Sequence, residues 1–114
     1  MNKYHNCKVS VDGIKFDSKA EARRYAELKL MEDTGHIKEL KLQPKFELQP
    51  KYKNSKGQCI RAITYKADFS YIETHSEVGK LIVEDVKGVE TKEFKLKKKM
   101  LEYKFPDIDF RIIK

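Results

Sequence analysis

The chain has 114 residues, a length typical of one domain, which excludes a multidomain enzyme. Hydrophobic residues make up 39% of it and charged residues 38%, and no apolar run approaches the roughly 18 to 20 residues that cross a bilayer. The formal net charge of +7 is typical of proteins that contact polyanions such as nucleic acids. We therefore expect a single domain over residues 1–114 that has no membrane partner. Because no apolar stretch follows the first charged residues, we also expect a cytoplasmic protein.

The first predicted elements are a β-hairpin and a helix. Residues 9–16 alternate between apolar and polar side chains around an Asp-Gly dipeptide, which is typical of a type I′ turn. Ser18 is a suitable N-cap for a helix that follows directly, and Glu21 completes a capping box three positions later. Gly35 is a suitable residue to end this helix.

The middle of the chain predicts several strands. Residues 37–42 and 46–48 are short extended segments that Pro44 separates, and residues 51–57 form a polar, lysine-rich turn. Residues 60–71 alternate with a period of two, so we predict one continuous strand there. The apolar face of this strand consists of Ile63, Tyr65, Ala67, Phe69 and Tyr71.

The last third of the chain predicts a strand, a helix and a strand. Residues 81–87 have apolar side chains on both faces, which indicates a central strand covered on each side. Thr91 is a suitable N-cap for a helix over residues 92–103, and residues 110–113 predict a last strand. This helix has two apolar groups on nearly opposite sides and can contact two surfaces. The groups are Phe94 with Leu101, and Leu96 with Met100 and Tyr103. The order of elements predicts an α/β or α+β domain with a central mixed β-sheet flanked by two helices.

Two charged residues lie on the apolar strand 81–87. Side chains two positions apart point to the same face, so Asp85 and Lys87 should lie together, about 6.6 to 6.8 Å apart along the strand. The carboxylate can hold a hard divalent cation, and the lysine can orient a water beside it as the ammonium ion or deprotonate it as the neutral amine. The alternative is a buried ion pair, although such pairs stabilise a fold only weakly because both charges must be desolvated.

Two more carboxylates are candidates for the same site. Asp68 lies on the polar face of its predicted strand and can supply a second ligand if that strand is a neighbour of the next one; its alternative is a solvated side chain. Glu21 can simply accept a hydrogen bond from the N-cap amide. However, Glu21, Tyr25 and Leu28 follow helical spacing on one stripe, so the Glu21 carboxylate can instead face the sheet.

These residues follow an order that resembles the PD-(D/E)XK nuclease superfamily: a helical glutamate, then an aspartate on a strand, then Asp-x-Lys on the next strand. A closer resemblance is to a family of small phage proteins assigned to that superfamily, and it covers nearly the whole chain. It rests on segments 12–25, 42–46, 65–69 and 84–88, which occur in the same order. One departure is Ala67, which stands where the superfamily usually has a proline before the first acidic residue.

The resemblance implies a restriction-endonuclease-like fold and an endonuclease that hydrolyses DNA phosphodiester bonds with Mg²⁺ or Mn²⁺. It implies that Asp68 and Asp85 bind the metal and that Glu21 binds it directly or through water. Lys87 would position the nucleophile, and Gln43 would correspond to a glutamine that some relatives place beside the site. It also implies a function in phage recombination or DNA processing, in the cytoplasm of a bacterial or phage-infected cell.

Two lysine-rich segments are candidates to bind the DNA backbone. Residues 48–67 contain five basic residues and no acidic one, and residues 92–99 contain five lysines and one glutamate. The candidate DNA-binding residues are Lys51, Lys53, Arg61, Lys95, Lys97, Lys98 and Lys99. A domain of this size has no separate recognition module, so we expect selection by DNA shape, such as a branch, flap or junction. Because one chain supplies one site, cutting both strands of a symmetrical junction predicts a homodimer.

Two other functions fit the same composition. One is a non-catalytic basic DNA-binding module on a nuclease scaffold, and the other is a structural protein with a solvated cationic face. A pure binder has no need for Asp85 and Lys87 on an apolar strand, and its affinity for DNA should not change when EDTA is added.

Overall fold

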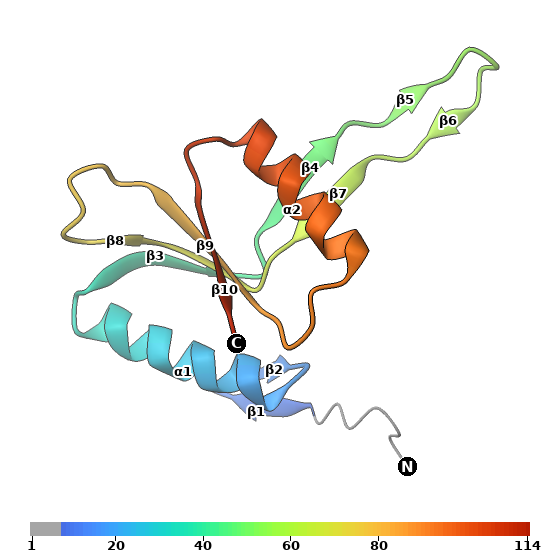
Figure 1. Ribbon diagram of the computed structural model, residues 1–114. Helices are drawn as coiled ribbons and strands as arrows, with labels where there is room; N and C mark the ends of the chain where they lie inside the picture. Colours follow the sequence, from blue (N-terminus) through green and yellow to red (C-terminus); the bar gives the residue numbers. More distant parts are fainter. Residues whose placement is uncertain (1–7) are drawn as a thin grey trace.

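Residues 8–114, the part of the chain that the computed structural model describes, form two helices and ten strands (Figure 1). In chain order these are β1 (Val9–Val11), β2 (Ile14–Phe16), α1 (Lys19–Asp33), β3 (Ile37–Leu42), β4 (Lys45–Gln49), β5 (Tyr52–Lys53), β6 (Cys59–Ile60), β7 (Ile63–Lys66), β8 (Phe69–Glu73), β9 (Leu81–Val86), α2 (Lys92–Lys104) and β10 (Asp109–Ile113). The order of elements and the mixed sheet described below confirm the predicted α+β class.

The hairpin and the first helix form as predicted. β1 and β2 pair antiparallel, and Asp12 and Gly13 between them have positive φ angles of +53° and +76°, as a type I′ turn requires. The Ser18 side chain accepts a hydrogen bond of 3.1 Å from the backbone amide of Glu21, which caps α1. Local signals in the sequence therefore determine these two elements.

A four-stranded sheet lies at the centre of the molecule, with the strand order β10-β9-β8-β3. β9 pairs in parallel with β10 and antiparallel with β8, which pairs antiparallel with β3, so the sheet is mixed. β9 is an inner strand, as its apolar sequence predicts. Ile82 belongs to the core on the α1 side and Val83 to the core on the α2 side, so β9 is covered on both faces.

A long two-stranded ribbon extends from this sheet. β4 pairs with β7, and β5 pairs with β6 further out, so the ribbon projects from the body of the molecule (Figure 1). The predicted continuous strand over residues 60–71 is wrong, because the structure divides it into β6, β7 and β8. The predicted turn over residues 51–57 is too long, since Tyr52 and Lys53 pair with Ile60 and Cys59. Alternation of side chains continues across a bend, so periodicity alone does not reveal these breaks.

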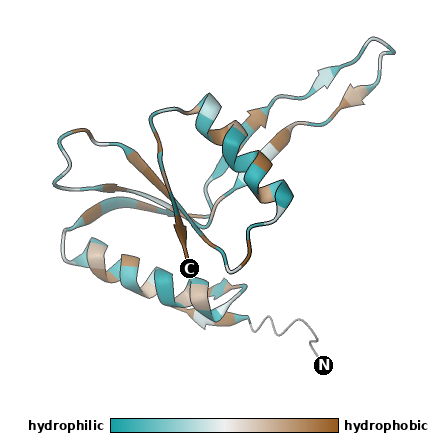
Figure 2. Ribbon diagram, in the orientation of Figure 1, coloured by the Kyte–Doolittle hydropathy of each residue, from teal (hydrophilic) through white to brown (hydrophobic). Residues whose placement is uncertain are grey.

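Two hydrophobic cores cover the two faces of the sheet. Phe69 and Tyr71 belong to the core under α1, whereas Tyr65 and Ala67 belong to the core under α2. The single apolar face predicted for residues 63–71 is therefore wrong, because the chain bends at Asp68 and the residues on either side of the bend enter different cores. Figure 2 shows strongly hydrophobic colouring on β9 and β10 and mainly hydrophilic colouring on α2.

α2 packs mainly through one of its two apolar groups, and from the other group Met100 packs against the same core. Phe94 and Leu101 are buried, but Leu96 is 59% exposed and Tyr103 is 90% exposed. Within residues 8–114, the second predicted contact surface of this helix is not formed. Neither helix in this part of the chain has the length and apolar character required to span a bilayer.

Candidate active site

The candidate site lies at the bend where the central sheet joins the ribbon. There the Gln43 amide donates a 2.9 Å hydrogen bond to the Asp68 carbonyl, and the Ala67 amide donates a 3.0 Å hydrogen bond to the Pro44 carbonyl. Gln43 has a φ of +50°, an uncommon conformation for a residue other than glycine and one that is concentrated at functional sites. A proline at position 67 has no amide hydrogen to donate, so Ala67 suits this bend.

Asp68 is held against the end of β9. Its backbone amide donates to the Glu84 carbonyl at 3.1 Å, and its Oδ2 atom accepts a hydrogen bond of 2.7 Å from the Val86 amide. β8 begins at the next residue and pairs with β9, with Phe69 opposite Glu84. The strand of Asp68 is therefore a neighbour of the strand of Asp85, as the sequence analysis required, and the Asp68 carboxylate has a defined direction.

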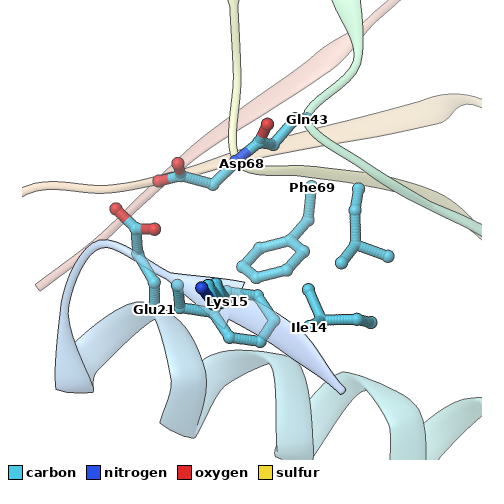
Figure 3. Close-up of a pocket in the computed structure, with 8 residues that line it drawn as sticks. Ile14, Lys15, Glu21, Gln43, Asp68 and Phe69 are labelled. Atoms are coloured by element: carbon cyan, nitrogen blue, oxygen red, sulfur yellow. The ribbon is translucent and has the colours of Figure 1, made fainter. Parts of the chain in front are cut away.

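Glu21 reaches the same place from the first turn of α1. Its backbone amide belongs to the helix cap, while its carboxylate points toward that of Asp68 across a pocket of about 170 Å³ (Figure 3). The pocket is lined by Ile14, Lys15, Phe16, Glu21, Leu42, Gln43, Asp68 and Phe69. The Ser18 hydroxyl thus caps the helix through the Glu21 amide, whereas the Glu21 side chain faces the sheet, as the second of the two alternatives predicts.

The carboxylates of this site repel one another. Burial raises the pKa of Glu21 to about 7, with further contributions from the charges of Asp68 and Asp17. Burial also raises the pKa of Asp68, although the hydrogen bond from β9 and the Lys87 ammonium group oppose this change. Acidic groups arranged in this way favour a proton or a cation between them.

Asp85 and Lys87 lie side by side at the end of β9. Lys87 Nζ is 4.0 Å from Asp85 Oδ2, so the two side chains meet as predicted. Asp85 is 1% exposed, and its Oδ2 atom has no hydrogen-bond donor among residues 8–114. Burial raises the pKa of Asp85 to about 6, against the effect of Lys87. The Lys87 ammonium group also lies 5.1 Å from the centre of the Phe94 ring, in cation–π contact.

The structure brings the predicted residues into two adjoining groups. Glu21, Gln43 and Asp68 line the pocket, whereas Asp85 pairs with Lys87 and does not line it. The groups are close enough for the Asp85 charge to raise the pKa of Glu21 and for the Lys87 charge to lower that of Asp68. In the described part of the chain, no three Asp, Glu, His or Cys side chains already have the arrangement of a metal site.

Sequence reasoning missed three charged residues near the site. Asp17 raises the pKa of both Glu21 and Asp68, Lys15 lines the pocket, and Lys66 lowers the pKa of Asp68. In the sequence, Lys15 and Asp17 are ordinary polar residues at the end of a hairpin. Their approach to Asp68 depends on how the hairpin and α1 pack against the sheet, for which the local sequence has no signal.

A buried ion pair on the opposite face of β9 attaches α1 to the sheet. Arg24 donates two hydrogen bonds to Glu84, of 2.8 Å from Nε and 2.6 Å from Nη2, and the Tyr71 hydroxyl donates to the same carboxylate. Glu84 is fully buried, with 0% exposure. The hydrogen bond to Glu84 raises the pKa of Arg24, and burial raises the pKa of Tyr71, so both groups remain donors. Because Arg24 lies about one helical turn after Glu21, this pair helps to position the Glu21 carboxylate.

The predicted DNA-binding lysines of α2 differ in their surroundings. Lys95 and Lys99 are exposed. Lys97 pairs with Glu93 at 3.3 Å, and Lys98 forms a similar pair at 3.2 Å with a glutamate one turn later. Surface pairs of this kind are weak, so these lysines can exchange their partners for phosphates.

Two positively charged areas lie outside the Glu21–Asp68 pocket. Lys97 lines a pocket of about 380 Å³ together with Lys66 and Lys87, which extends from the candidate site toward α2. Lys51, Lys53 and Arg61 are exposed on the outer part of the ribbon. The predicted DNA-binding residues therefore occupy two surfaces, one on α2 and one on the ribbon.

Comparison with known proteins gives one match. No curated protein and no solved structure matches the chain. The match to a protein family covers residues 1–114, the full length of the chain. The chain therefore belongs to the family described as "Protein of unknown function (DUF1064)".

Proposed function

We propose that this protein is a metal-dependent DNA endonuclease that hydrolyses phosphodiester bonds. The observation that carries the proposal is the facing pair of Glu21 and Asp68, whose carboxylates share one pocket close to the buried Asp85 (Figure 3). These residues also stand in the order of the PD-(D/E)XK resemblance. The mixed sheet between two helices is compatible with the restriction-endonuclease-like fold that the resemblance implies.

The side chains of the site suit Mg²⁺ or Mn²⁺. Glu21, Asp68 and Asp85 all offer carboxylate oxygens, the ligands that hard divalent cations prefer. One of these oxygens, Asp85 Oδ2, is a buried acceptor without a donor in the described part of the chain. A cation held by these residues would lower the pKa of a bound water and neutralise the charge that develops on the phosphate oxygens.

The neighbouring residues have supporting roles in this proposal. Lys87, next to Asp85, would position the attacking water and stabilise negative charge on the phosphate. Gln43, on the rim of the pocket, would orient the phosphate or the water through its side-chain amide. The hydrogen bond from Val86 keeps the Asp68 carboxylate directed toward Glu21, so the site is arranged before the substrate binds.

The proposed substrate is branched DNA, such as a four-way junction or a flap. The lysines of α2 and the basic residues of the ribbon would bind backbone phosphates, which give affinity without reading bases. A homodimer would supply the two sites needed to cut both strands of a symmetrical junction. We place this activity in phage recombination or DNA processing, in the cytoplasm of a bacterial or phage-infected cell.

The second candidate function is a non-catalytic DNA-binding module. It is favoured by the exposed basic side chains of the ribbon and of α2, which can bind backbone phosphates without a metal. The effect of divalent cations distinguishes the two candidate functions. A non-catalytic module should bind DNA equally well in EDTA and should leave every DNA substrate intact.

The test is a cleavage assay with the purified full chain on supercoiled, linear and four-way-junction DNA, in Mg²⁺, Mn²⁺ or EDTA. We expect metal-dependent cleavage that favours the junction. Asp68→Asn, Asp85→Asn and Lys87→Met should each lower the rate about 100-fold or more. Asp107→Asn, in an exposed turn after α2, is the matched control and should cleave normally.

Each result has a defined meaning. Absence of cleavage by the wild-type protein on all substrates with both metals would reject the enzyme and leave the binding module. Normal rates for Asp68→Asn and Asp85→Asn would reject the assigned ligands. Equal cutting of linear and junction DNA would reject selection by DNA shape.

A further inference from the structure

Residues 51–61 form an arm at the outer end of the ribbon, and hydrogen bonds hold its two strands together although none of its residues belongs to either core. Tyr52 pairs with Ile60 across β5 and β6. At the tip, the Asn54 amide donates to the Gln58 carbonyl at 3.0 Å, and the Gly57 amide donates to the Asn54 carbonyl at 3.0 Å. The Asn54 side chain accepts a further hydrogen bond of 3.0 Å from the Gln58 amide. The turn thus supplies hydrogen bonds that hold two strands together where no core does so.

Such an arm contributes little to the stability of the fold. An isolated two-stranded ribbon is marginally stable in water, and this one projects away from the body of the molecule (Figure 1). Its aromatic residue, Tyr52, is 48% exposed. Because the arm leaves an aromatic side chain in solvent and buries little apolar surface, its geometry is better explained by a partner than by folding.

The charge of the arm indicates the chemistry of that partner. No Asp or Glu occurs between positions 48 and 67, so the basic side chains of the arm have no acidic neighbour on their own strands. These side chains are Lys51, Lys53, Lys56 and Arg61, and all four are exposed. Tyr52 and Ile60 share one face of the ribbon, while Lys53 shares the other face with Cys59. The arm therefore combines a basic face with a small apolar face, which suits a polyanion with a groove.

We propose that the arm inserts into the major groove of B-form duplex DNA, beside the bond presented to the Glu21–Asp68 pocket. A two-stranded β-ribbon fits the major groove, which is about 12 Å wide. Lys51, Lys53 and Arg61 contact phosphates on the groove walls. This inference rests on the proposed function for the position of the DNA, because the strands of the arm run directly into the bend that contains Gln43 and Asp68.

The covalent connection sets how far from the pocket the arm can act. Gln43 and Lys51 are eight residues apart, so the chain between them spans at most about 26 to 29 Å. At about 3.4 Å per base pair, this distance corresponds to ~8 base pairs of duplex. Lys51, where the arm begins, therefore lies within about 8 base pairs of the bond to be cut.

Duplex DNA fits the arm better than the other nucleic acids do. A-form RNA has a deep and narrow major groove that does not admit a ribbon. Proteins that bind single strands present several aromatic side chains to successive bases, whereas Tyr52 is the only aromatic residue in positions 51–61. Double-stranded RNA and single-stranded DNA therefore serve as competing ligands in the test.

The experiment measures binding in EDTA, so that it is independent of cleavage. The full-length wild-type protein, Lys53→Ala with Arg61→Ala, and Tyr52→Ala are titrated against a fluorescent 30-base-pair duplex by anisotropy at several salt concentrations. The matched control is Lys38→Ala with Lys80→Ala, which removes the same charge from exposed positions outside the arm. Circular dichroism and thermal melting verify that each variant is folded.

We expect the arm double variant to weaken duplex binding at least 10-fold and to lower the salt slope by about 2, since each phosphate contact contributes about 0.9. The control should change affinity less than 2-fold. Equal losses of duplex affinity in the arm and control variants would overturn the proposal. Arm-dependent binding of double-stranded RNA or single-stranded DNA that is as strong as binding of duplex DNA would overturn it as well.

The arm and the proposed function can fail separately. Arm-dependent duplex binding without cleavage in Mg²⁺ or Mn²⁺ would reject the nuclease and support the arm. If the wild-type protein cleaves DNA but the arm double variant binds duplex as well as the control variant does, the arm proposal is rejected and the nuclease is supported.

Discussion

Glu21→Gln should make the metal-free protein more stable at pH 8, because it removes a negative charge that is partly buried and that also faces Asp68. The pKa of Glu21 is about 7 in the folded chain, compared with an ordinary value of 4.5. When folding raises the pKa of a carboxyl group, ionisation is easier in the unfolded chain than in the folded one. The folded state then loses stability as the pH rises from about 4.5 to about 7, and the loss remains above pH 7.

The size of the effect follows from this difference in pKa. At about 1.36 kcal/mol for each pKa unit, a rise from 4.5 to about 7 sets a ceiling of ~3.4 kcal/mol. Glu21 is partly exposed, so solvent screening reduces this value. In addition, a carboxylate in the first turn of a helix is stabilised by ~0.3 to 1 kcal/mol through the helix dipole, which glutamine loses. We expect a net gain of ~1 to 2 kcal/mol at pH 8 and little gain at pH 4.

The assay is urea unfolding in EDTA at pH 4 and pH 8, followed by circular dichroism. Glu77→Gln, at an exposed position in the loop between β8 and β9, is the isosteric control and should match the wild-type protein at both pH values. Mg²⁺ should stabilise the wild-type protein and reduce its difference from Glu21→Gln, because a bound cation neutralises the same charges. If Glu21→Gln is the less stable protein at pH 8, neither burial of the Glu21 charge nor its repulsion by Asp68 destabilises the folded state, and the reasoning is refuted.

Three further predictions concern other parts of the molecule. Arg24→Met should lower the free energy of unfolding by ~3 to 5 kcal/mol, because it leaves the Glu84 carboxylate buried without its cation. A double-mutant cycle with Glu84→Gln, measured by urea unfolding, should give a coupling energy above ~1 kcal/mol. Strictly additive losses of stability would contradict the ion pair. The Tyr65 hydroxyl is buried without a hydrogen-bond partner among residues 8–114, so Tyr65→Phe should raise the free energy of unfolding by up to ~1 kcal/mol. A clear loss of stability in the same assay would show that the hydroxyl is hydrogen-bonded in solution. Lys97→Ala with Lys98→Ala should weaken DNA binding and flatten its salt dependence, and an unchanged titration curve would remove α2 from the DNA-binding surface.

Local signals predicted most of the secondary structure correctly. The Asp-Gly turn and the Ser18 cap act within a few residues, so their outcome does not depend on the rest of the chain. The apolar pattern of residues 81–87 predicts an inner strand, since a strand covered on both faces has apolar residues at consecutive positions, and the structure confirms it. Within the site, the two-residue period placed Asp85 and Lys87 together, and helical spacing directed Glu21 toward the sheet.

Features that depend on distant contacts were not predictable in the same way. The bend at Gln43 and Asp68 is held by backbone hydrogen bonds between the β3–β4 and β7–β8 connections and between Asp68 and β9. The partners in these hydrogen bonds are far apart in the chain. The same bend transfers Phe69 to a different core from that of Tyr65, which the alternating pattern cannot show.

The sequence alone determined the hairpin, the two helices, the inner strand and the residue types available for chemistry, since these depend on short-range propensities and on composition. Only the tertiary structure decided that Glu21 and Asp68 face each other, that Asp85 adjoins them with Lys87, and that Asp17 adds a further charge. Such distances result from the packing of α1 and the hairpin against the sheet. That packing is the sum of many weak contacts over the whole chain, so no single segment contains the information.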